Sequence, residues 1–516
     1  MTTPSQPRPG TDETPTPPPG CPAHRPAGGA RRLYGPEAEH DLGGLYEELR
    51  AEYGAVAPVL LHQDVPAWVV LGHSENLHMV RTPSHFTRDS RYWSAIQDGT
   101  AGPTHPLAPV FTWQPMCTFA EGAEHKRLRG AVTSAIGGID GRGVRRCIAR
   151  SSQELVNAVC QIGTAELVGQ FAEHLPMMVL CEILGMPEEY SERMVGAARD
   201  MIKGTETAIA SNEYVMQALT RLTLRRRARP AEDFASALIA HESRLTDDEV
   251  AQHLRLVLIA AYEATANLIA NVLRMVMTDP RFRARLNGGQ MTVPEAVEQT
   301  LWDEPPFSAM VPYVAKQDTE LGGQRIRAGD ALLLGIAPGN ADPVVRPVPG
   351  AHMQGNRAHL AFSGGPHECP GQDIGRAITE GGVDALLTRL PDVQLAVDES
   401  ELEWTSSVLS RHLVTLPVAF TPTPLQDVAR APVAGNAVLR DDEEWHVGDP
   451  AGERVPAVAG VAAAAAPGAA APTGAMAPTP AGTGVAAPFA GGVPEPAAPA
   501  HAPGPLRRFL RWWHRL

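Results

Sequence analysis

Apolar residues in this chain recur mainly with helical spacing, most clearly between 254 and 277. Thr246 precedes that stretch and Glu249 follows three residues later, which is the pattern of a capping box at a helix N-terminus. Thr292 and Glu295 repeat the pattern further along. We therefore expect one long helix after Thr246 and another after Thr292.

Other segments extend this picture of a mainly helical protein. Helical patterns are also predicted at 124–136, 144–162, 173–184 and 375–389. Short strands are predicted at 67–71, 311–315, 331–336 and 413–420. The strands are too few for a sheet-dominated fold, so the predicted fold class is mainly α with a small β part.

Composition divides the 516 residues into four segments. Residues 1–30 are rich in Pro, Thr and Gly and are expected to be disordered, because they have little apolar surface to bury. Residues 31–428 combine apolar periodicity with turns and are expected to be globular. Residues 429–505 are mostly Ala, Pro and Gly and are interpreted as a linker, since repeated prolines stop helices from propagating.

The last segment, 506–516, is predicted to be a basic amphipathic helix. Its apolar face would consist of Leu506, Phe509, Leu510, Trp513 and Leu516. Arginines surround that face, which suits docking to a membrane surface or to an acidic protein partner. The alternative is a basic tail without a role.

Charge and cysteine usage exclude several classes of protein. The net charge of −14 argues against nucleic-acid binding by the whole molecule. Six scattered cysteines with no CxxC pattern indicate neither a disulfide framework nor a zinc site. No apolar run of about 18 residues and no secretory signal is recognised, so a cytoplasmic protein is expected, with the tail as a possible peripheral membrane contact.

Cys369 is the residue most informative about chemistry. It lies in a Gly-rich segment, 362–371, directly before a predicted helix. The helix N-terminus favours a thiolate, and Gly364, Gly365 and Gly371 leave room for a flat cofactor to approach the backbone. A thiolate held in this way is suited to be the axial ligand of a haem. The alternative is a structural cysteine in a surface turn.

The same segment resembles the haem loop of cytochromes P450, which reads Phe-Gly-x-Gly-x-His-x-Cys-x-Gly. The matching positions are Phe362, Gly365, His367, Cys369 and Gly371. Ser363 stands in place of the first glycine. The resemblance covers about 31–428 and implies a P450 fold, haem b, and Cys369 as the ligand of its iron.

Two further segments extend the resemblance. His125 and Arg129 lie four residues apart, on one face of what resembles the family's C-helix, and would hold a haem propionate, with His367 on the other side. Glu263 matches the acid of the family's I-helix. Ala264 stands where relatives have a threonine whose hydroxyl relays protons.

Thr265 follows one residue later, turned by about 100° around the helix, so it is not expected to face the iron. Glu263, Ala264 and Thr265 are the predicted catalytic positions. The alternative interpretation of Glu263 is a mid-helix acid that faces a salt-bridge partner.

The family's K-helix motif Glu-x-x-Arg is replaced here by Gln299 and Trp302, with Glu298 one position out of register. Because both positions differ together, we expect a substitute contact. The chain is similar to a small bacterial P450 group with this substitution. Tyr313 takes the place of a propionate-binding arginine, and residues 346–357 lack the family's arginine pattern.

The resemblance implies a monooxygenase that inserts one oxygen atom into a small organic substrate. Electrons would come from a separate ferredoxin or flavodoxin, for which Lys126, Arg127 and Arg376 are expected to form a docking surface on the thiolate side. One alternative is a catalytically weak P450-fold haem protein in a signalling complex with a small GTPase system. Another is an enzyme that uses hydrogen peroxide, or a substrate hydroxyl in place of the missing threonine.

Overall fold

The computed structural model describes residues 30–428, apart from 36–37, 39, 103–104, 106–110, 188–189, 204–206, 349, 354 and 407–409. The predictions for 1–29 and for 429–516, which include the linker and the basic tail, lie outside the described residues.

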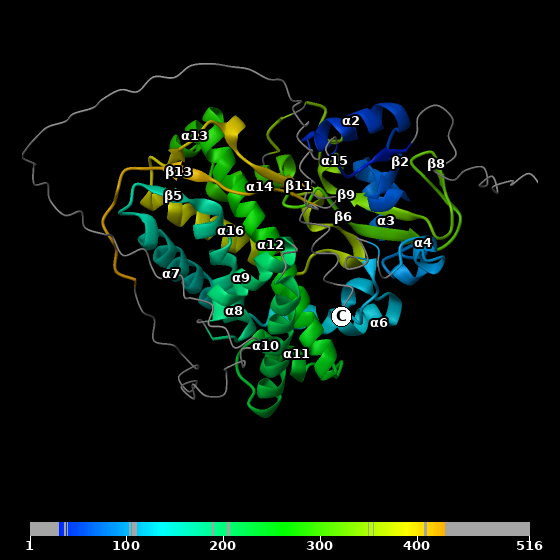
Figure 1. Ribbon diagram of the computed structural model, residues 1–516, viewed down its shortest axis with the longest axis horizontal. Helices are drawn as coiled ribbons and strands as arrows, with labels where there is room; N and C mark the ends of the chain where they lie inside the picture. The colour runs from blue at the N-terminus through cyan, green and yellow to red at the C-terminus, as the bar shows by residue number, and fades with distance from the viewer. Residues whose placement is uncertain are drawn as a thin grey trace, which may run out of the picture. The chain divides into compact units, whose positions relative to one another are not determined.

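Helices form most of the described chain (Figure 1). In the first half they are α2 (Leu42–Tyr53), α3 (His73–Arg81), α4 (Ser94–Gln97), α6 (Gly122–Gly137), α7 (Gly141–Val159), α8 (His174–Leu184), α9 (Tyr190–Lys203) and α10 (Ala208–Ala228). In the second half they are α11 (Phe234–Ala240), α12 (Asp247–Thr278), α13 (Pro280–Asn287), α14 (Val293–Asp303), α15 (Ile336–Asn340) and α16 (Gln372–Arg389).

Both predicted capping boxes are present. The Thr246 hydroxyl accepts from the Glu249 backbone N–H at the start of α12, and Thr292 does the same for Glu295 at the start of α14. In each case the glutamate side chain returns a bond to the backbone of the capping residue, which satisfies a second free N–H group. The helices predicted at 124–136, 144–162, 173–184 and 375–389 correspond to α6, α7, α8 and α16.

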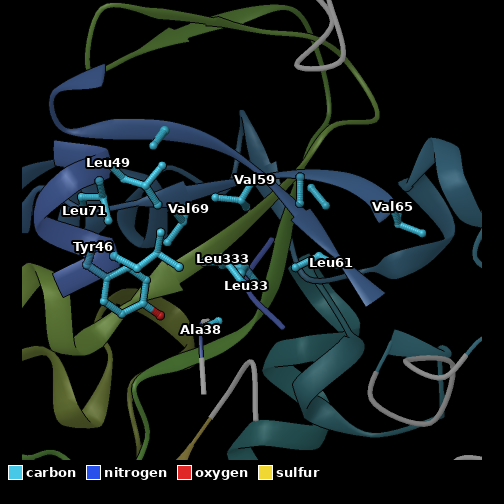
Figure 2. Packing of buried hydrophobic residues seen from close by; sticks show 14 of the residues in the cluster. Leu33, Ala38, Tyr46, Leu49, Val59, Leu61, Val65, Val69, Leu71 and Leu333 are labelled. Atoms are coloured by element: carbon cyan, nitrogen blue, oxygen red, sulfur yellow. The ribbon is translucent and has the colours of Figure 1, made fainter. Parts of the chain in front are cut away.

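One mixed sheet carries most of the β structure. Its strands are β1 (Arg31–Arg32), β2 (Val56–Leu61), β3 (Val65–Val70), β9 (Ala331–Gly335), β6 (Ala309–Ala315) and β4 (Phe86–Thr87), in that spatial order. Figure 2 shows apolar residues from β2, β3 and β9 packing against α2, with Tyr46 and Leu49 reaching the sheet from the helix. The antiparallel pairing of β4 with β6 sets Thr87 beside Val314, and this register matters for the site below.

The remaining strands form three small sheets. They are β5 (Thr164–Glu166), β7 (Thr319–Leu321), β8 (Gln324–Ile326), β10 (Gln394–Leu395), β11 (Trp404–Ser406), β12 (Arg411–Leu413) and β13 (Pro417–Ala419). The single strand predicted at 413–420 is therefore wrong. The chain forms β12 and β13 there, which pair in different sheets, with β11 and with β5 and β10.

Helix α12 runs through the middle of the helical part and packs against α8, α10, α14 and α16 (Figure 1). It is long and apolar enough to cross a membrane by length and composition, although no uninterrupted apolar run of about 18 residues is recognised in the sequence. More than half of its most apolar window is buried inside the protein, 56%. The helix is therefore apolar because it lies in the core, and its N-terminal cap fixes where it enters that core.

Candidate functional site

The segment before α16 is a compact loop built from two short 3₁₀ helices, η6 (Leu360–Phe362) and η7 (Gly365–His367). The Cys369 backbone N–H donates to the Phe362 carbonyl at 2.9 Å, which closes the loop. Gly365 has φ +65°, and a Cβ atom there would lie 2.2 Å from the Val80 carbonyl oxygen. Glycine is therefore required at this position by the contact with the end of α3, rather than by a cofactor.

The loop also contains a strained residue. Ser363 has φ 60° and ψ −150°, a backbone conformation that is essentially restricted to glycine. Ser363 stands where the resemblance expects a glycine, and its backbone has a conformation typical of glycine. The cost of holding a serine in it has to be met by contacts around the loop.

Cys369 is partly buried at the start of α16. Burial raises the pKa of its thiol above the ordinary value. The backbone N–H of Gly371, at the helix N-terminus, lowers the pKa of Cys369, and so do the nearby Arg129 and Arg376. The predicted effect of the helix N-terminus is therefore present, and burial opposes it. Deprotonation would accompany coordination of a metal.

Polar side chains from three elements meet beside this loop. The rings of His125 on α6 and His367 on η7 lie 4.3 Å apart between centroids. His367 Nε2 is 3.3 Å from Glu121 Oε1, and the same oxygen accepts from the Arg88 backbone N–H at 2.9 Å. The Arg88 guanidinium lies over the ring of Tyr313, 5.6 Å from its centroid. The structure thus brings both predicted histidines together and adds an arginine.

Two side chains in this cluster have buried nitrogen atoms without partners. Among the described residues, His125 Nε2 and the Nε and Nη2 atoms of Arg88 have no hydrogen-bond partner. Burial, and then repulsion by His367, lowers the pKa of His125 to about 4. Buried donors of this kind are normally hydrogen-bonded, so they indicate an anionic ligand at this position.

Arg88 was missed in the sequence because it belongs to no motif of the resemblance. Its place follows from the pairing of β4 with β6, which puts Thr87 beside Val314 and hence Arg88 near Tyr313. Arg88, directly after β4, thus brings an arginine next to Tyr313.

Arg129 is directed to a different part of the loop from His125. Its guanidinium donates to the Glu368 carbonyl and, through Nε, to the Thr133 hydroxyl at 3.2 Å. Both members of the predicted pair therefore reach the haem-loop segment, but Arg129 braces the backbone next to Cys369.

The donor set fits the haem that the resemblance implies. Arg88, His125 and His367 provide nitrogen donors for carboxylate groups, and Cys369 provides a sulfur ligand across the loop. A Cβ atom on Gly371 would meet no other atom within 4 Å, so the backbone is open at that point. The residues present would thus hold the two propionates and the iron.

The predicted catalytic positions lie in the middle of α12, which is continuous there. Burial raises the pKa of Glu263 to about 7. Neither a hydrogen bond nor an ion pair joins Glu263 to any described residue, so the salt-bridge interpretation receives no support. Ala264 is half-buried, whereas Thr265 is buried, with its Oγ1 atom 3.8 Å from where a Cβ atom on Gly375 would lie. Thr265 therefore faces α16.

Gln299 and Trp302, both buried on α14, make the expected substitute contacts. Gln299 Oε1 accepts from the Met353 backbone N–H at 2.9 Å, and Trp302 Nε1 donates to the Asn356 carbonyl at 2.9 Å. These bonds join α14 to the segment 346–357. Neutral groups thus make this connection.

The view that 346–357 lacks a bracing arginine is wrong. Arg346 pairs with Asp303 at 2.5 Å, and Arg357 lies 3.5 Å from Glu298. Glu298, one position out of register, also pairs with Arg376 at 2.5 Å. The charges of this region are present but shifted along α14.

This pairing also corrects the proposed docking surface. Arg376 is 5% exposed and is used inside the protein. Arg127 pairs with Glu124 on its own helix and with Glu249 on α12. Of the three basic residues, Lys126 alone is exposed without such a structural role among the described residues.

A scan against protein-family models finds no match. The chain is similar to nocardicin C N-oxygenase of Nocardia uniformis subsp. tsuyamanensis, with 32% identity over 400 residues that cover 75% of this chain and 98% of the relative. It is similar to cytochrome P450 CYP107DY1 of Priestia megaterium, with 27% identity over 75% of this chain and 97% of the relative. Among solved structures, a myxobacterial cytochrome P450, CYP267B1 in complex with myristic acid, superposes with a TM-score of 0.67 at 27% identity, covering 75% of this chain and 98% of that one.

Proposed function

The chain belongs to the cytochrome P450 family, as a haem b monooxygenase, and from this premise we propose that it inserts one oxygen atom into a small organic substrate. The observation that carries the site assignment is the pair of buried, unpartnered donors on Arg88 and His125 beside the loop of Cys369. When bound, haem supplies the activation of oxygen, and the protein orients the substrate and controls protons.

Each residue near the loop has a distinct part in this proposal. Cys369 is the axial ligand, and Phe362, Gly365 and Gly371 shape the loop that presents it. Arg88, His125 and His367 hold the propionates, a role supported by their buried nitrogen donors. Arg129 acts by bracing the Glu368 carbonyl next to Cys369.

Proton handling falls to the middle of α12. Glu263 has a pKa raised to about 7 by burial, so it exchanges a proton near neutral pH, as a general acid–base group requires. Ala264 offers no hydroxyl, and the Thr265 hydroxyl is turned toward α16. Water, the substrate or Glu263 itself therefore has to complete the proton path.

We also infer that the chain belongs to the atypical P450 group without the K-helix Glu-x-x-Arg motif. The neutral contacts of Gln299 and Trp302 to residues 353 and 356 support this placement. The electron donor in the proposal is a separate ferredoxin or flavodoxin, and the protein acts in the cytoplasm. For the segment 506–516, contact with a membrane surface or an acidic partner remains our proposal, to be tested by truncation after residue 504.

One measurement distinguishes the catalytic proposals. Oxygen consumption by the haem-loaded protein is followed with a surrogate ferredoxin system, and product and peroxide are quantified against it. A monooxygenase forms product in proportion to oxygen consumed, whereas a peroxide-using enzyme forms product only when peroxide is supplied. A protein with a binding or signalling role forms product in neither case, and this outcome would overturn the proposal. A screen for ligand-induced Soret shifts supplies the candidate substrates.

A further inference from the structure

Glu298 on α14 joins three segments that are far apart in the sequence. Its Oε1 atom accepts from Arg376 Nε on α16 at 2.5 Å, and its Oε2 atom lies 3.1 Å from His359 Nε2, just before η6. All three side chains are buried. Burial alone would raise the pKa of Glu298, but the hydrogen bonds from His359 and Arg376 hold it below its ordinary value, so the group is a carboxylate.

Both partners of Glu298 pack on the ring of Phe362. The Arg376 guanidinium lies over that ring, 4.4 Å from its centroid, and the His359 ring lies 5.7 Å away. The Phe362 carbonyl in turn accepts the backbone N–H of Cys369 at 2.9 Å. Glu298 therefore positions two side chains that pack on Phe362, the residue whose carbonyl is hydrogen-bonded to Cys369.

Ser363, the residue after Phe362, has a strained backbone that the packing on Phe362 helps to hold. Ser363 is held at φ 60° and ψ −150°. A non-glycine residue keeps such a conformation only where its surroundings over-determine it. The packing on Phe362 fixes the backbone on one side of Ser363, and the contact of Gly365 with the Val80 carbonyl fixes it on the other.

Charge gives Glu298 a second effect. Arg376 packs on the ring of Phe362, whose carbonyl accepts the Cys369 backbone N–H, so its positive charge lies close to the loop of Cys369. Because Arg376 is 5% exposed, water screens it poorly, and Glu298 is its buried counter-charge. Loss of the carboxylate would leave a net positive charge behind the sulfur, and loss of the guanidinium would leave a net negative one.

We propose that Glu298 is a positioning residue for Cys369: it clamps Phe362 between Arg376 and His359, holds the strained loop, and balances the charge of Arg376 behind the sulfur. This inference rests on the proposed role of Cys369 as iron ligand. It assigns to the out-of-register glutamate a role that the neutral pair of Gln299 and Trp302 does not fill.

The test uses the full-length, haem-loaded protein and three variants: Glu298→Gln, Arg376→Gln and the double variant. The first readout is the reduction potential of the iron. Glu298→Gln should raise it, because an unbalanced cation favours the added electron, and Arg376→Gln should lower it. We expect about a tenfold change in the reduction equilibrium constant in each direction, about 59 mV for one electron. The double variant should lie near the parent.

Asp303→Asn is the matched control. It removes the ion pair between α14 and Arg346 without touching Phe362, so it should lower stability and leave the potential unchanged. The second readout is the fraction of the reduced, carbon monoxide-bound protein that shows the red-shifted Soret band of thiolate ligation. Glu298→Gln should lower this fraction several-fold, and adding Ser363→Gly should restore most of it, since glycine adopts the loop conformation without strain.

Shifts of the potential in the same direction for both single variants would overturn the proposal, because structural damage alone produces that pattern. A shift in Asp303→Asn equal to that in Glu298→Gln would also overturn it. If a single variant does not retain haem, the double variant is measured in its place, since removal of a buried pair as a unit is tolerated better than removal of one partner. If the double variant does not retain haem either, this result counts against the proposed role of Glu298. Failure of the proposed function is a separate outcome, in which Cys369→Ala keeps the red-shifted band.

Discussion

The two regions that meet at the proposed haem site treat buried charge in opposite ways. On the side of Cys369, ionic groups are paired: Glu298 on α14 with Arg376 on α16, and Asp303 on α14 with Arg346. In the middle of α12, burial raises the pKa of Glu263 to about 7, and none of the described residues pairs with it. A paired charge fixes geometry, whereas an unpaired acid with a pKa near 7 exchanges protons. We therefore distinguish a holding region, around Cys369 with α14 and α16, which would bind the cofactor, from a second region in the middle of α12, which would exchange protons.

The strongest test of the holding region is Cys369→Ala. The variant should lose the red-shifted Soret band of the reduced, carbon monoxide-bound protein completely, because Cys369 is the cysteine of the loop before α16. Cys181→Ala, at a buried cysteine in α8, is the matched control and should keep the band. Persistence of the band in Cys369→Ala would refute the ligand assignment.

Trp302→Ala should be the next largest effect. The ring is 2% exposed, stacks on His73 at 6.2 Å between centroids and donates to the Asn356 carbonyl. Truncation of a buried tryptophan costs about 3–5 kcal/mol, so the variant should lose haem or unfold in chemical denaturation. Trp302→Phe keeps most of the ring and should lose about 1–2 kcal/mol for the hydrogen bond and part of the packing. Equal losses in both variants would mean that ring packing is not what matters.

The K-helix pair of relatives should not rescue this chain. Gln299 Nε2 donates to Asp303 Oδ2 at 2.9 Å, so a carboxylate at position 299 would face another carboxylate. The double variant Gln299→Glu with Trp302→Arg should therefore be less stable than the parent. The reason is repulsion within α14 and not a missing arginine in 346–357, since Arg346 and Arg357 are present there.

Glu263 allows the second region to be tested through pH. Its folded pKa of about 7 lies above the ordinary value, so its contribution to stability is complete below about pH 4.5 and is lost as the pH rises through 7. Glu263→Gln removes this loss. Its free energy of unfolding relative to the parent should increase by up to about 3 kcal/mol between pH 5 and pH 8.

Urea unfolding at both pH values measures this difference. Glu213→Gln, at an exposed residue of α10, is the control. Parallel stability curves for Glu263→Gln and the parent would show that Glu263 is solvated or paired, and the contrast between the two regions would disappear.

Ser363→Gly tests the backbone strain in the holding region. Glycine takes the observed φ of 60° without steric cost, so the variant should be more stable by about 1–3 kcal/mol. The gain should be largest in Glu298→Gln, where the clamp is absent. A loss of stability in Ser363→Gly would mean that the serine side chain contributes more than its backbone strain removes.

Local features of the sequence were sufficient for α6, α7, α8, α12, α14 and α16 and for the loop of Cys369, because capping boxes, apolar periodicity and the Gly-rich segment each lie within a few residues. The features that failed depend on pairing across the chain. Arg88 is recognisable only once β4 lies beside β6, and the roles of Glu298 and Arg376 only once α14 lies beside α16. The strand at 413–420 failed for a similar reason, since its two halves pair in different sheets.

The smallest expected effect concerns the coupling of oxygen use to product. Ala264 is half-buried at the middle of α12, and no hydroxyl is available from Thr265, which faces Gly375 on α16. Ala264→Thr should therefore lower the peroxide released per oxygen consumed by a factor of about two to ten, less than the roughly 10²–10⁴-fold that a positioned acid–base group contributes to a reaction rate. Thr265→Ala is the matched control and should leave that ratio unchanged. If Thr265→Ala instead raises peroxide release and Ala264→Thr has no effect, the buried threonine is part of the proton path, and α12 distorts during turnover to bring it there.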